Sequence, residues 1–134
     1  MGTLPVISSM TAGIIMILQI VLMMTTALGR GKNKQSLGDG GKEPMLRLIR
    51  RHGNLAENSG LFIACFGLLE MLGTNRTLVL SLCGAFILAR LSHAIALSME
   101  NTVGLLRLIG AAGTMIVGLI TAGFLIKMAA PFFL

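Results

Sequence analysis

The chain is organised around residues 47–58, Arg-Leu-Ile-Arg-Arg-His-Gly-Asn-Leu-Ala-Glu-Asn, which lead through Ser59 and Gly60 into the apolar run 61–69. Placed on one helix at about 100° per residue, the polar side chains gather within an arc of roughly 120°. This polar face consists of Arg47, Arg50, Arg51, Asn54, Glu57 and Asn58. His52 falls on the opposite side. A strongly polar face at the mouth of a membrane helix predicts a functional site, because ionisable groups are costly there.

The composition indicates a membrane protein. Of the 134 residues, 54% are hydrophobic and 12% are charged, and the mean hydropathy is +0.86. Soluble domains usually carry about 25% charged residues. A chain of this length accommodates four membrane spans of about 20 residues each and little else. We therefore expect an all-α, integral membrane four-helix bundle that forms a single domain over residues 1–134.

The apolar runs place the four spans at about residues 4–28, 44–72, 76–99 and 105–130. The first run is too long for the apolar core of a signal peptide, and no basic residue precedes it, so we expect a transmembrane helix. Its main polar break, Gln19, should hydrogen-bond to another helix. Segment 30–42 is rich in glycine and lysine, which predicts a flexible, exposed loop.

Basic residues gather on one side of the expected membrane. The first loop and the start of the second span carry Arg30, Lys32, Lys34, Lys42, Arg47, Arg50 and Arg51. Arg90 and Arg107 lie toward the same side, whereas the other side has Arg76 and Lys127. Lys and Arg are enriched in cytoplasmic loops. The polar face should therefore lie on the cytoplasmic side, with both chain termini across the membrane.

The composition also disfavours other classes of function. A net charge of +6 could suggest nucleic acid as a partner, but the basic residues sit beside the spans and the aromatic residues are six Phe, so stacking platforms are missing. Cys65 and Cys83 lie in apolar runs and are interpreted as free thiols, and two cysteines make no metal framework. A small four-helix drug exporter would need an acidic residue deep in the first span, where we find only Gln19.

The third span carries a second polar arc. Arg90, His93, Leu97 and Glu100 fall within roughly 80° of one another on a helical projection and lie toward the same membrane side as the polar face. One interpretation is an internal salt-bridge network, such as Arg50 with Glu57 and Arg90 with Glu100. The other is an anionic guest, because the arginines here outnumber the acids and Arg suits carboxylate recognition.

A stripe of small residues follows the fourth span. Gly110, Thr114, Gly118 and Ala122 recur every four residues. Small residues on one stripe let helix backbones approach closely. We interpret the stripe as a packing surface, within or between subunits, that carries no chemistry.

At these residues the chain resembles the MAPEG family, the membrane-associated proteins in eicosanoid and glutathione metabolism. The segment Arg47-x-x-Arg50-x-His52-x-Asn54-x-x-Glu57 is similar to the family's helix-two signature, and Arg90-x-x-His93 is similar to its third-helix motif. The resemblance covers nearly the whole chain. It implies homotrimers of four-helix subunits that bind glutathione in polar clefts between neighbouring subunits, near the cytoplasmic face. Family members conjugate glutathione to electrophiles, reduce hydroperoxides or isomerise eicosanoid precursors.

Carried over residue by residue, the resemblance implies a glutathione site. The matching residues are Arg30, Arg50, Asn54, Glu57, Arg90, His93 and Arg107. Glu57 would accept hydrogen bonds from the ammonium group of the tripeptide, and Asn54 would bond its polar backbone. Arg30 resembles a basic residue that the neighbouring subunit supplies. Arg107 resembles the arginine near the start of helix four that activates the thiol.

Two departures from the family pattern bear on catalysis. Gly53 stands where several members carry Arg, and Leu97 stands where many carry Tyr. The chain has no Tyr at all, so the cation that stabilises a thiolate should be Arg107 or Arg90. Lowering a thiol pKa of about 8.5 by two units takes about 2.7 kcal/mol. One close Arg in a dry cleft can supply that preference.

Two functions follow from these expectations. The first is a glutathione-dependent membrane transferase or peroxidase, with glutathione as co-substrate and a lipophilic electrophile collected from the lipid bilayer. The alternative is a non-catalytic membrane protein of the same fold that serves as an assembly or sensing module.

Overall fold

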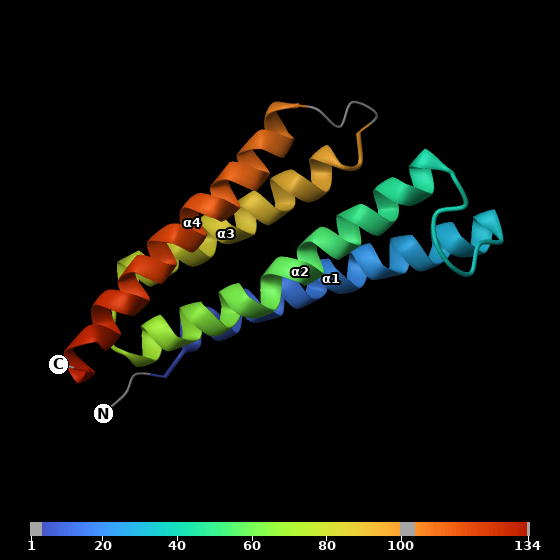
Figure 1. Ribbon diagram of the computed structural model, residues 1–134. Helices are drawn as coiled ribbons and strands as arrows, with labels where there is room; N and C mark the ends of the chain where they lie inside the picture. The colour runs from blue at the N-terminus through green and yellow to red at the C-terminus, as the bar shows by residue number, and fades with distance from the viewer. Residues whose placement is uncertain (1–3, 100–103, 134) are drawn as a thin grey trace.

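The computed structural model describes residues 4–99 and 104–133 and forms a bundle of four long helices. They are α1 (Val6–Asn33), α2 (Glu43–Met71), α3 (Arg76–Ala96) and α4 (Leu105–Ala129), followed by the short 3-10 helix η1 (Ala130–Phe132). Figure 1 shows two antiparallel hairpins, α1 with α2 and α3 with α4, with both chain ends at one end of the bundle. We call that end the terminal end. The opposite end, which carries the α1–α2 loop and the start of α4, is the basic end.

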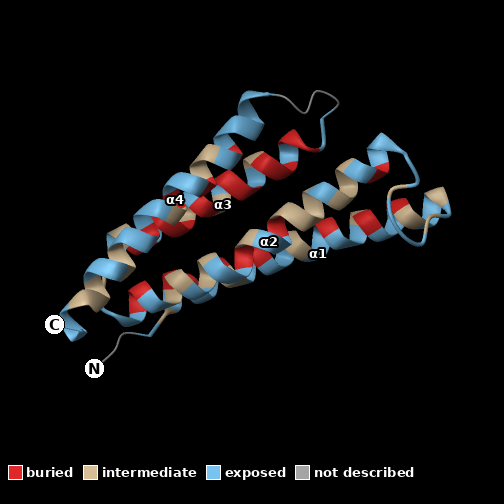
Figure 2. Cartoon of the chain, in the orientation of Figure 1, coloured by how far each residue is buried: buried red, intermediate tan, exposed pale blue. Residues whose placement is uncertain are grey.

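The bundle is apolar on the outside as well as the inside. Among the described residues, α1, α3 and the stretch Leu105–Phe132 are each long and apolar enough to cross a membrane. α2 does not qualify by composition, because its first half carries the polar face. Its 29 residues nevertheless reach about 43 Å, and it packs against the other three long helices. Figure 2 shows the buried residues where helices meet and the exposed residues facing outward. An all-α membrane bundle was predicted and is confirmed.

An aromatic cluster fixes α2 against α3. The rings of Phe62 and Phe86 stack with their centroids 4.5 Å apart, and Phe66 meets both rings edge-on. Phe66 and Phe86 are fully buried. Aromatic pairs at such distances contribute about 0.5–1.5 kcal/mol beyond their buried area. The cluster sets the register that brings the polar face of α2 level with the last turns of α3.

The α1–α2 hairpin differs from the expectation at its loop. α1 continues to Asn33, whereas the sequence suggested an end at residue 28 and a flexible loop from residue 30. Gly29 lies inside the helix, where an added Cβ would come 2.5 Å from Leu48 Cδ1. Here glycine permits close helix packing and does not break the helix. Thr26 Oγ1 adds a hydrogen bond to Leu48 O at 3.1 Å, so the pairing of α1 and α2 holds this last stretch helical.

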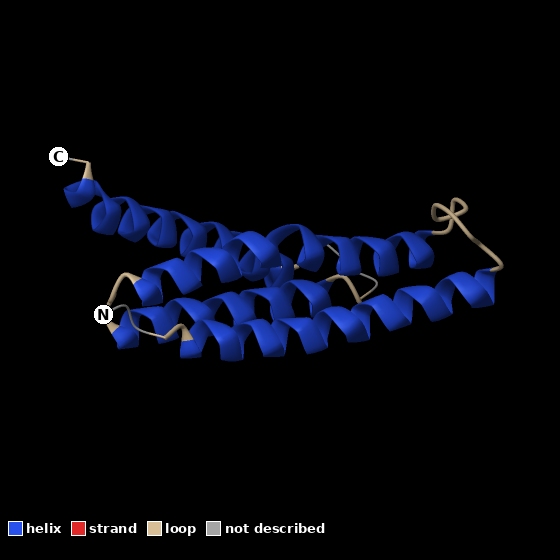
Figure 3. Cartoon of the chain, turned by 90° about the horizontal axis from the view of Figure 1, so that it is seen from below, coloured by secondary structure: helices blue, strands red, loops and turns tan. Residues whose placement is uncertain are grey.

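The small-residue stripe of α4 is partly a contact within the subunit. An added Cβ at Gly110 would lie 2.7 Å from His93 Cβ, so α3 and α4 touch backbone to backbone there. Thr114 is also buried, and Gly118 faces the Phe62 ring of α2. Figure 3 shows α4 leaning away from the other helices toward its C-terminal end, and Ala122 is exposed. The packing role is therefore confirmed for the first half of the stripe.

Candidate functional site

A cavity of about 230 Å³ opens at the basic end, between α2, α3 and the start of α4. It is lined by Glu43, Leu46, Arg47, Arg50, Asn54, His93, Leu97 and Arg107. The structure thus brings together the polar face and the third-helix motif, which are distant in the sequence. Of the expected site residues, Arg50, Asn54, His93 and Arg107 line this cavity. Glu57, Arg30 and Arg90 do not.

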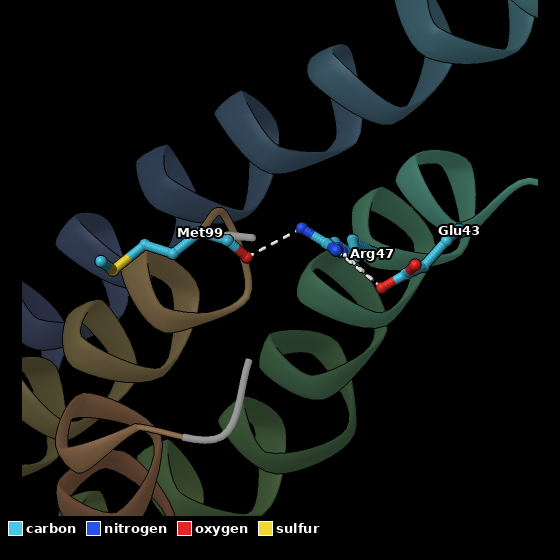
Figure 4. A network of polar contacts seen from close by, with 3 residues as sticks. All are labelled: Glu43, Arg47 and Met99. Carbon is cyan, nitrogen blue, oxygen red and sulfur yellow. Dashed lines mark hydrogen bonds and ion pairs between the residues drawn. The ribbon is translucent and has the colours of Figure 1, made fainter. Parts of the chain in front are cut away.

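Arg47 is held in place by contacts on both sides. Its Nη2 lies 2.6 Å from Glu43 Oε1 one turn earlier on α2, and its Nη1 donates to Met99 O at 2.9 Å. Figure 4 shows the guanidinium extended between these two groups. The contact to Met99 joins the start of α2 to the segment after α3. Arg47 therefore closes one wall of the cavity, with its charge partly balanced.

Arg50 and Glu57 carry charges that the described part of the subunit leaves unmatched. Both are exposed on α2, and within residues 4–99 and 104–133 neither side chain makes a hydrogen bond or an ion pair. The expected internal pair between them is not formed. Seven residues separate them, which is about 10 Å along the helix axis. The other suggested pair, between Arg90 and Glu100, involves a residue outside the described ranges.

Arg90 lies behind the cavity, not in it. It is 4% exposed, and its guanidinium donates to Asn54 O at 3.3 Å, to Gly110 O at 3.1 Å and to Thr114 Oγ1. One side chain of α3 thus bridges α2 and α4. Five donors in a fixed fork suit such a bridge better than the point charge of Lys would. This geometry makes Arg90 a positioning residue for Asn54 and for the start of α4.

Two further arginines also serve the local structure. Arg51 donates to Ser98 Oγ at 2.6 Å and to Thr25 Oγ1 at 2.8 Å, which ties α1, α2 and the end of α3 together. The sequence placed Arg51 on the polar face, but it turns toward α1 and does not line the cavity. Arg30, in the last turn of α1, donates to two carbonyl oxygens of the loop that follows, both at 3.1 Å. Its expected contribution to a neighbouring subunit stays a prediction.

The comparisons with known proteins agree with this arrangement. The family model described as "MAPEG family" matches residues 8–127. The chain belongs to the MAPEG family. Neither the curated proteins nor the solved structures give a significant match. Family membership makes the chain an integral membrane protein of the glutathione and eicosanoid metabolism type.

The departures from the MAPEG pattern fall on the cavity or beside it. Leu97, at the position where many members carry Tyr, is 6% exposed and lines the cavity. An added Cβ at Gly53 would meet only Glu57 Oε1, at 3.7 Å, so the position has room for the Arg that several members carry. This MAPEG chain therefore has one apolar wall and one open position where relatives place polar groups.

Sequence reasoning missed the role of one buried acid and misjudged one amide. Glu70, on α2 at the terminal end, is 8% exposed and accepts hydrogen bonds from Ile7 N and Ser8 N, both at 2.9 Å, and from Ser8 Oγ at 2.7 Å. It caps α1, which has no side-chain cap of its own. The sequence signal for this role was a single acid, Glu70, inside an apolar run.

Gln19 Oε1 is buried without a hydrogen-bond partner among the described residues, so its expected interhelical bond is not made.

Proposed function

We propose that this MAPEG protein is a glutathione-dependent membrane transferase or peroxidase acting on lipophilic electrophiles. The observation that carries the proposal is the charge balance of the cavity. Among the residues that the structure describes, Arg47, Arg50 and Arg107 line it with one acid, Glu43, which already pairs with Arg47. An excess of guanidinium charge favours a ligand that brings carboxylates. Glutathione carries a carboxylate at each end, and it is the thiol that the family uses.

The shape of the site favours assembly. A cavity of about 230 Å³ is smaller than the roughly 300–1,000 Å³ typical of small-molecule sites. Glu57 is exposed on a membrane helix, where an unpaired charge costs about 2.5–3.5 kcal/mol. A neighbouring subunit packed on this face of α2 would enlarge the site and cover Glu57. We therefore propose a homotrimer with three equivalent clefts, to which Arg30 of a neighbouring subunit contributes.

Native mass spectrometry of the detergent-solubilised protein tests this assembly. The expected species is a trimer, because a closed ring covers the α2 face of every subunit equally and the family resemblance implies three subunits. A stable monomer or dimer would contradict the proposal.

Within each cleft, we assign roles by charge and position. Arg50 pairs with a glutathione carboxylate, Asn54 bonds its amide backbone, and Glu57 accepts from its ammonium group. His93 is buried against the cavity and supports the wall. The enrichment of Lys and Arg at the basic end favours a cytoplasmic orientation, where soluble glutathione is available.

Arg107 is the residue proposed to stabilise the thiolate. It lies in the first turn of α4 and lines the cavity. The positive end of the α4 dipole lies at the same place and favours an anion by about 0.3–1 kcal/mol. Only an interaction stronger with thiolate than with thiol speeds the reaction.

The reaction then takes one of two forms. In transfer, the sulfur attacks the electrophilic carbon, a C–S bond forms and the leaving group departs with its electron pair. In peroxide reduction, the sulfur attacks the terminal oxygen, which releases an alcohol and a glutathione sulfenic acid, and a second glutathione converts this acid to the disulfide and water.

Replacing Arg107 with Leu tests this mechanism. We expect Arg107→Leu to cut conjugation of a model electrophile at least tenfold, about 1.4 kcal/mol of barrier. Glutathione affinity should stay within about threefold, below 1 kcal/mol. Raising the pH toward about 9 should partly restore the rate, because the free thiol then ionises by itself. Arg76→Leu, at the terminal end, is the matched control and should leave turnover unchanged.

The alternatives have distinct outcomes. If Arg107→Leu retains full activity while Arg90→Leu abolishes it without loss of binding, Arg107 does not stabilise the thiolate, and the reaction depends on the positions that Arg90 gives to Asn54 and the start of α4. If neither change matters, or if the purified protein binds glutathione without turnover, the non-catalytic alternative replaces the enzyme.

A further inference from the structure

The loop between α1 and α2 begins with a defined turn. Gln35 N donates to Arg30 O at 3.0 Å, and Lys34 N donates to Gly31 O at 3.2 Å. This is the hydrogen-bond pattern of a Schellman cap, in which glycine is the usual residue at the position of Lys34. Lys34 takes the left-handed conformation there, with φ at 50°, although a Cβ disfavours it. A strained lysine at the end of a membrane helix points to a use for its charge.

Side chains from the end of α1 fold the loop back onto that helix. Arg30 Nη1 donates to Ser36 O and to Gly38 O, both at 3.1 Å. Gln35 Nε2 donates to Leu37 O between them. Three successive carbonyl oxygens are therefore held by side chains. The side chain of Leu37, at the middle of this segment, is left 80% exposed.

The folded loop lies at the level of the lipid headgroups. α3 has 21 residues and is about 32 Å long, close to the roughly 30 Å of a hydrocarbon core. Arg51 bonds to Ser98 just after α3 and to Thr25 of α1, which places Thr25 near the hydrocarbon boundary. Arg30 lies about 8 Å further along α1, and the headgroup layer is about 5–8 Å thick on each side. Figure 1 shows the loop extending beyond the end of α3.

Positive charge surrounds the exposed leucine. Residues 30–42 include four basic residues and one acid, Asp39, whose Oδ1 accepts a hydrogen bond from Gly41 N at 3.0 Å. Lys32 and Lys34 are exposed, and within residues 4–99 and 104–133 neither amino group makes a hydrogen bond or an ion pair. The loop therefore presents cationic groups and one apolar side chain together, at the depth of the headgroups.

We propose that this loop binds the anionic phospholipid headgroups of the leaflet at the basic end. Lys32 and Lys34 pair with lipid phosphates, and Leu37 inserts between the headgroups. Basic residues beside a membrane span are attracted to anionic leaflets. The bilayer already surrounds the helices at this level, whereas a soluble partner would have to displace it. None of these three residues lines the glutathione cavity, so lipid binding and glutathione binding are separable.

The absence of Trp and Tyr from the sequence provides a clean probe. Leu37→Trp introduces one tryptophan at the proposed point of insertion. The full-length protein is reconstituted in nanodiscs of phosphatidylcholine with brominated acyl chains, with or without phosphatidylglycerol. Phosphatidylglycerol should shift the emission to shorter wavelength and increase quenching by the brominated chains. Leu4→Trp, 79% exposed at the terminal end, is the control, and its quenching should not depend on phosphatidylglycerol.

The lysines are tested in the Leu37→Trp protein. Each of Lys32→Gln and Lys34→Gln should lower the ratio of bound to free loop about fivefold, the contribution of one basic residue near an anionic surface. The double variant should be quenched no more than in phosphatidylcholine alone, and its glutathione affinity should equal that of the wild type. Arg76→Gln, which removes a charge at the terminal end, should leave the quenching of Trp at position 37 unchanged.

The shape of the loop is tested at its glycines. Gly40 has φ at 62°, and an added Cβ would lie 2.6 Å from Gln35 Oε1. Gly40→Ala should therefore disturb the bond from Gln35 to Leu37 O and reduce quenching in the presence of phosphatidylglycerol. Gly31→Ala is the matched control, because an added Cβ there meets nothing within 4 Å. Equal quenching in the two alanine variants would contradict the role of the folded loop.

Three results would overturn the binding of anionic lipid. Equal quenching with and without phosphatidylglycerol would show apolar insertion without headgroup recognition. Quenching that survives in the double lysine variant would place the cationic contact elsewhere. Emission typical of tryptophan in water, in both kinds of nanodisc, would show a loop that stands free for a soluble partner. If the Leu37→Trp protein does not assemble, Ser36→Trp, at the exposed neighbouring position, carries the same test.

Discussion

Charged side chains in the two halves of the bundle differ in whether the subunit supplies their hydrogen-bond partners. At the terminal end, the buried Glu70 accepts three hydrogen bonds from the first turn of α1, all between 2.7 and 2.9 Å. Between the basic end and the middle of α2, Arg50 and Glu57 face outward and pair with nothing in the described part of the chain. A charge satisfied inside the subunit belongs to the fold. A charge without a partner in the described part of the subunit indicates a surface that binds a ligand or a neighbouring subunit.

The arginines of the basic end differ in whether they line the cavity. Arg90 and Arg51 are bonded to neighbouring helices, and both lie outside the cavity. Arg50 and Arg107 line the cavity instead. We infer that Arg90 and Arg51 position the helices around the cleft and that Arg50 and Arg107 contact the ligand bound in it.

The largest expected effect is on stability at the terminal end. Glu70→Leu would leave two buried amide groups of α1 without an acceptor, each worth about 1–3 kcal/mol, so we expect a loss of about 3–5 kcal/mol. Glu43→Leu is the matched control, because it removes an exposed ion pair worth less than about 1 kcal/mol. Thermal unfolding in detergent measures both. Similar losses for the two variants would break the contrast between a buried structural carboxylate and an exposed one.

The next effect compares two arginines. Arg90→Lys cannot reach acceptors on α2 and α4 together and should destabilise the protein by about 2–4 kcal/mol. Arg50→Lys should change stability by less than about 0.5 kcal/mol, as surface substitutions do. Glutathione affinity should respond to Arg50→Lys, because bidentate contact with a carboxylate is lost. If Arg90→Lys were as stable as the wild type, Arg90 would not be a structural bridge.

These predictions depend on features that the sequence reveals unequally. The apolar composition predicted the four-helix membrane bundle, and the polar face and third-helix motif predicted that Arg50, Asn54 and His93 would lie toward one membrane side. The family resemblance added Arg107. Periodicity relates Arg50 to Asn54, which lie one turn apart on the second span, whereas the approach of His93 and Arg107 depends on how the helices pack. The family was also recognisable, because fixed polar positions inside a membrane helix are rare.

What the sequence could not show is which neighbour each side chain meets. Arg51 and Arg50 are adjacent in the sequence, yet Arg51 turns toward Thr25 of α1 while Arg50 lines the cavity. The bond between Glu70 and Ser8 joins residues on different helices, and no local pattern connects them. The extent of α1 was underestimated because Gly29 looked like a helix end, whereas Leu48 packs onto it.

Glu57 tests whether the leftover charges serve binding. Glu57→Gln keeps the shape of the side chain and removes the charge. It should weaken glutathione binding by about 1.5–3 kcal/mol, the range for hydrogen bonds to charged groups. Isothermal titration calorimetry measures the change. Equal affinities for wild type and Glu57→Gln would remove Glu57 from the site.

The most direct test of the account is the pKa of the thiol of bound glutathione, followed by the ultraviolet absorbance of the thiolate as the pH is raised. In the wild type we expect the pKa of the bound thiol to lie at least one unit below the free value of about 8.5, a preference of about 1.4 kcal/mol for the thiolate. Arg107→Leu should return the pKa to the free value, and Arg76→Leu should leave it lowered. A thiol that titrates in the wild-type protein as it does in water would contradict the claim that this arginine-rich cleft activates glutathione.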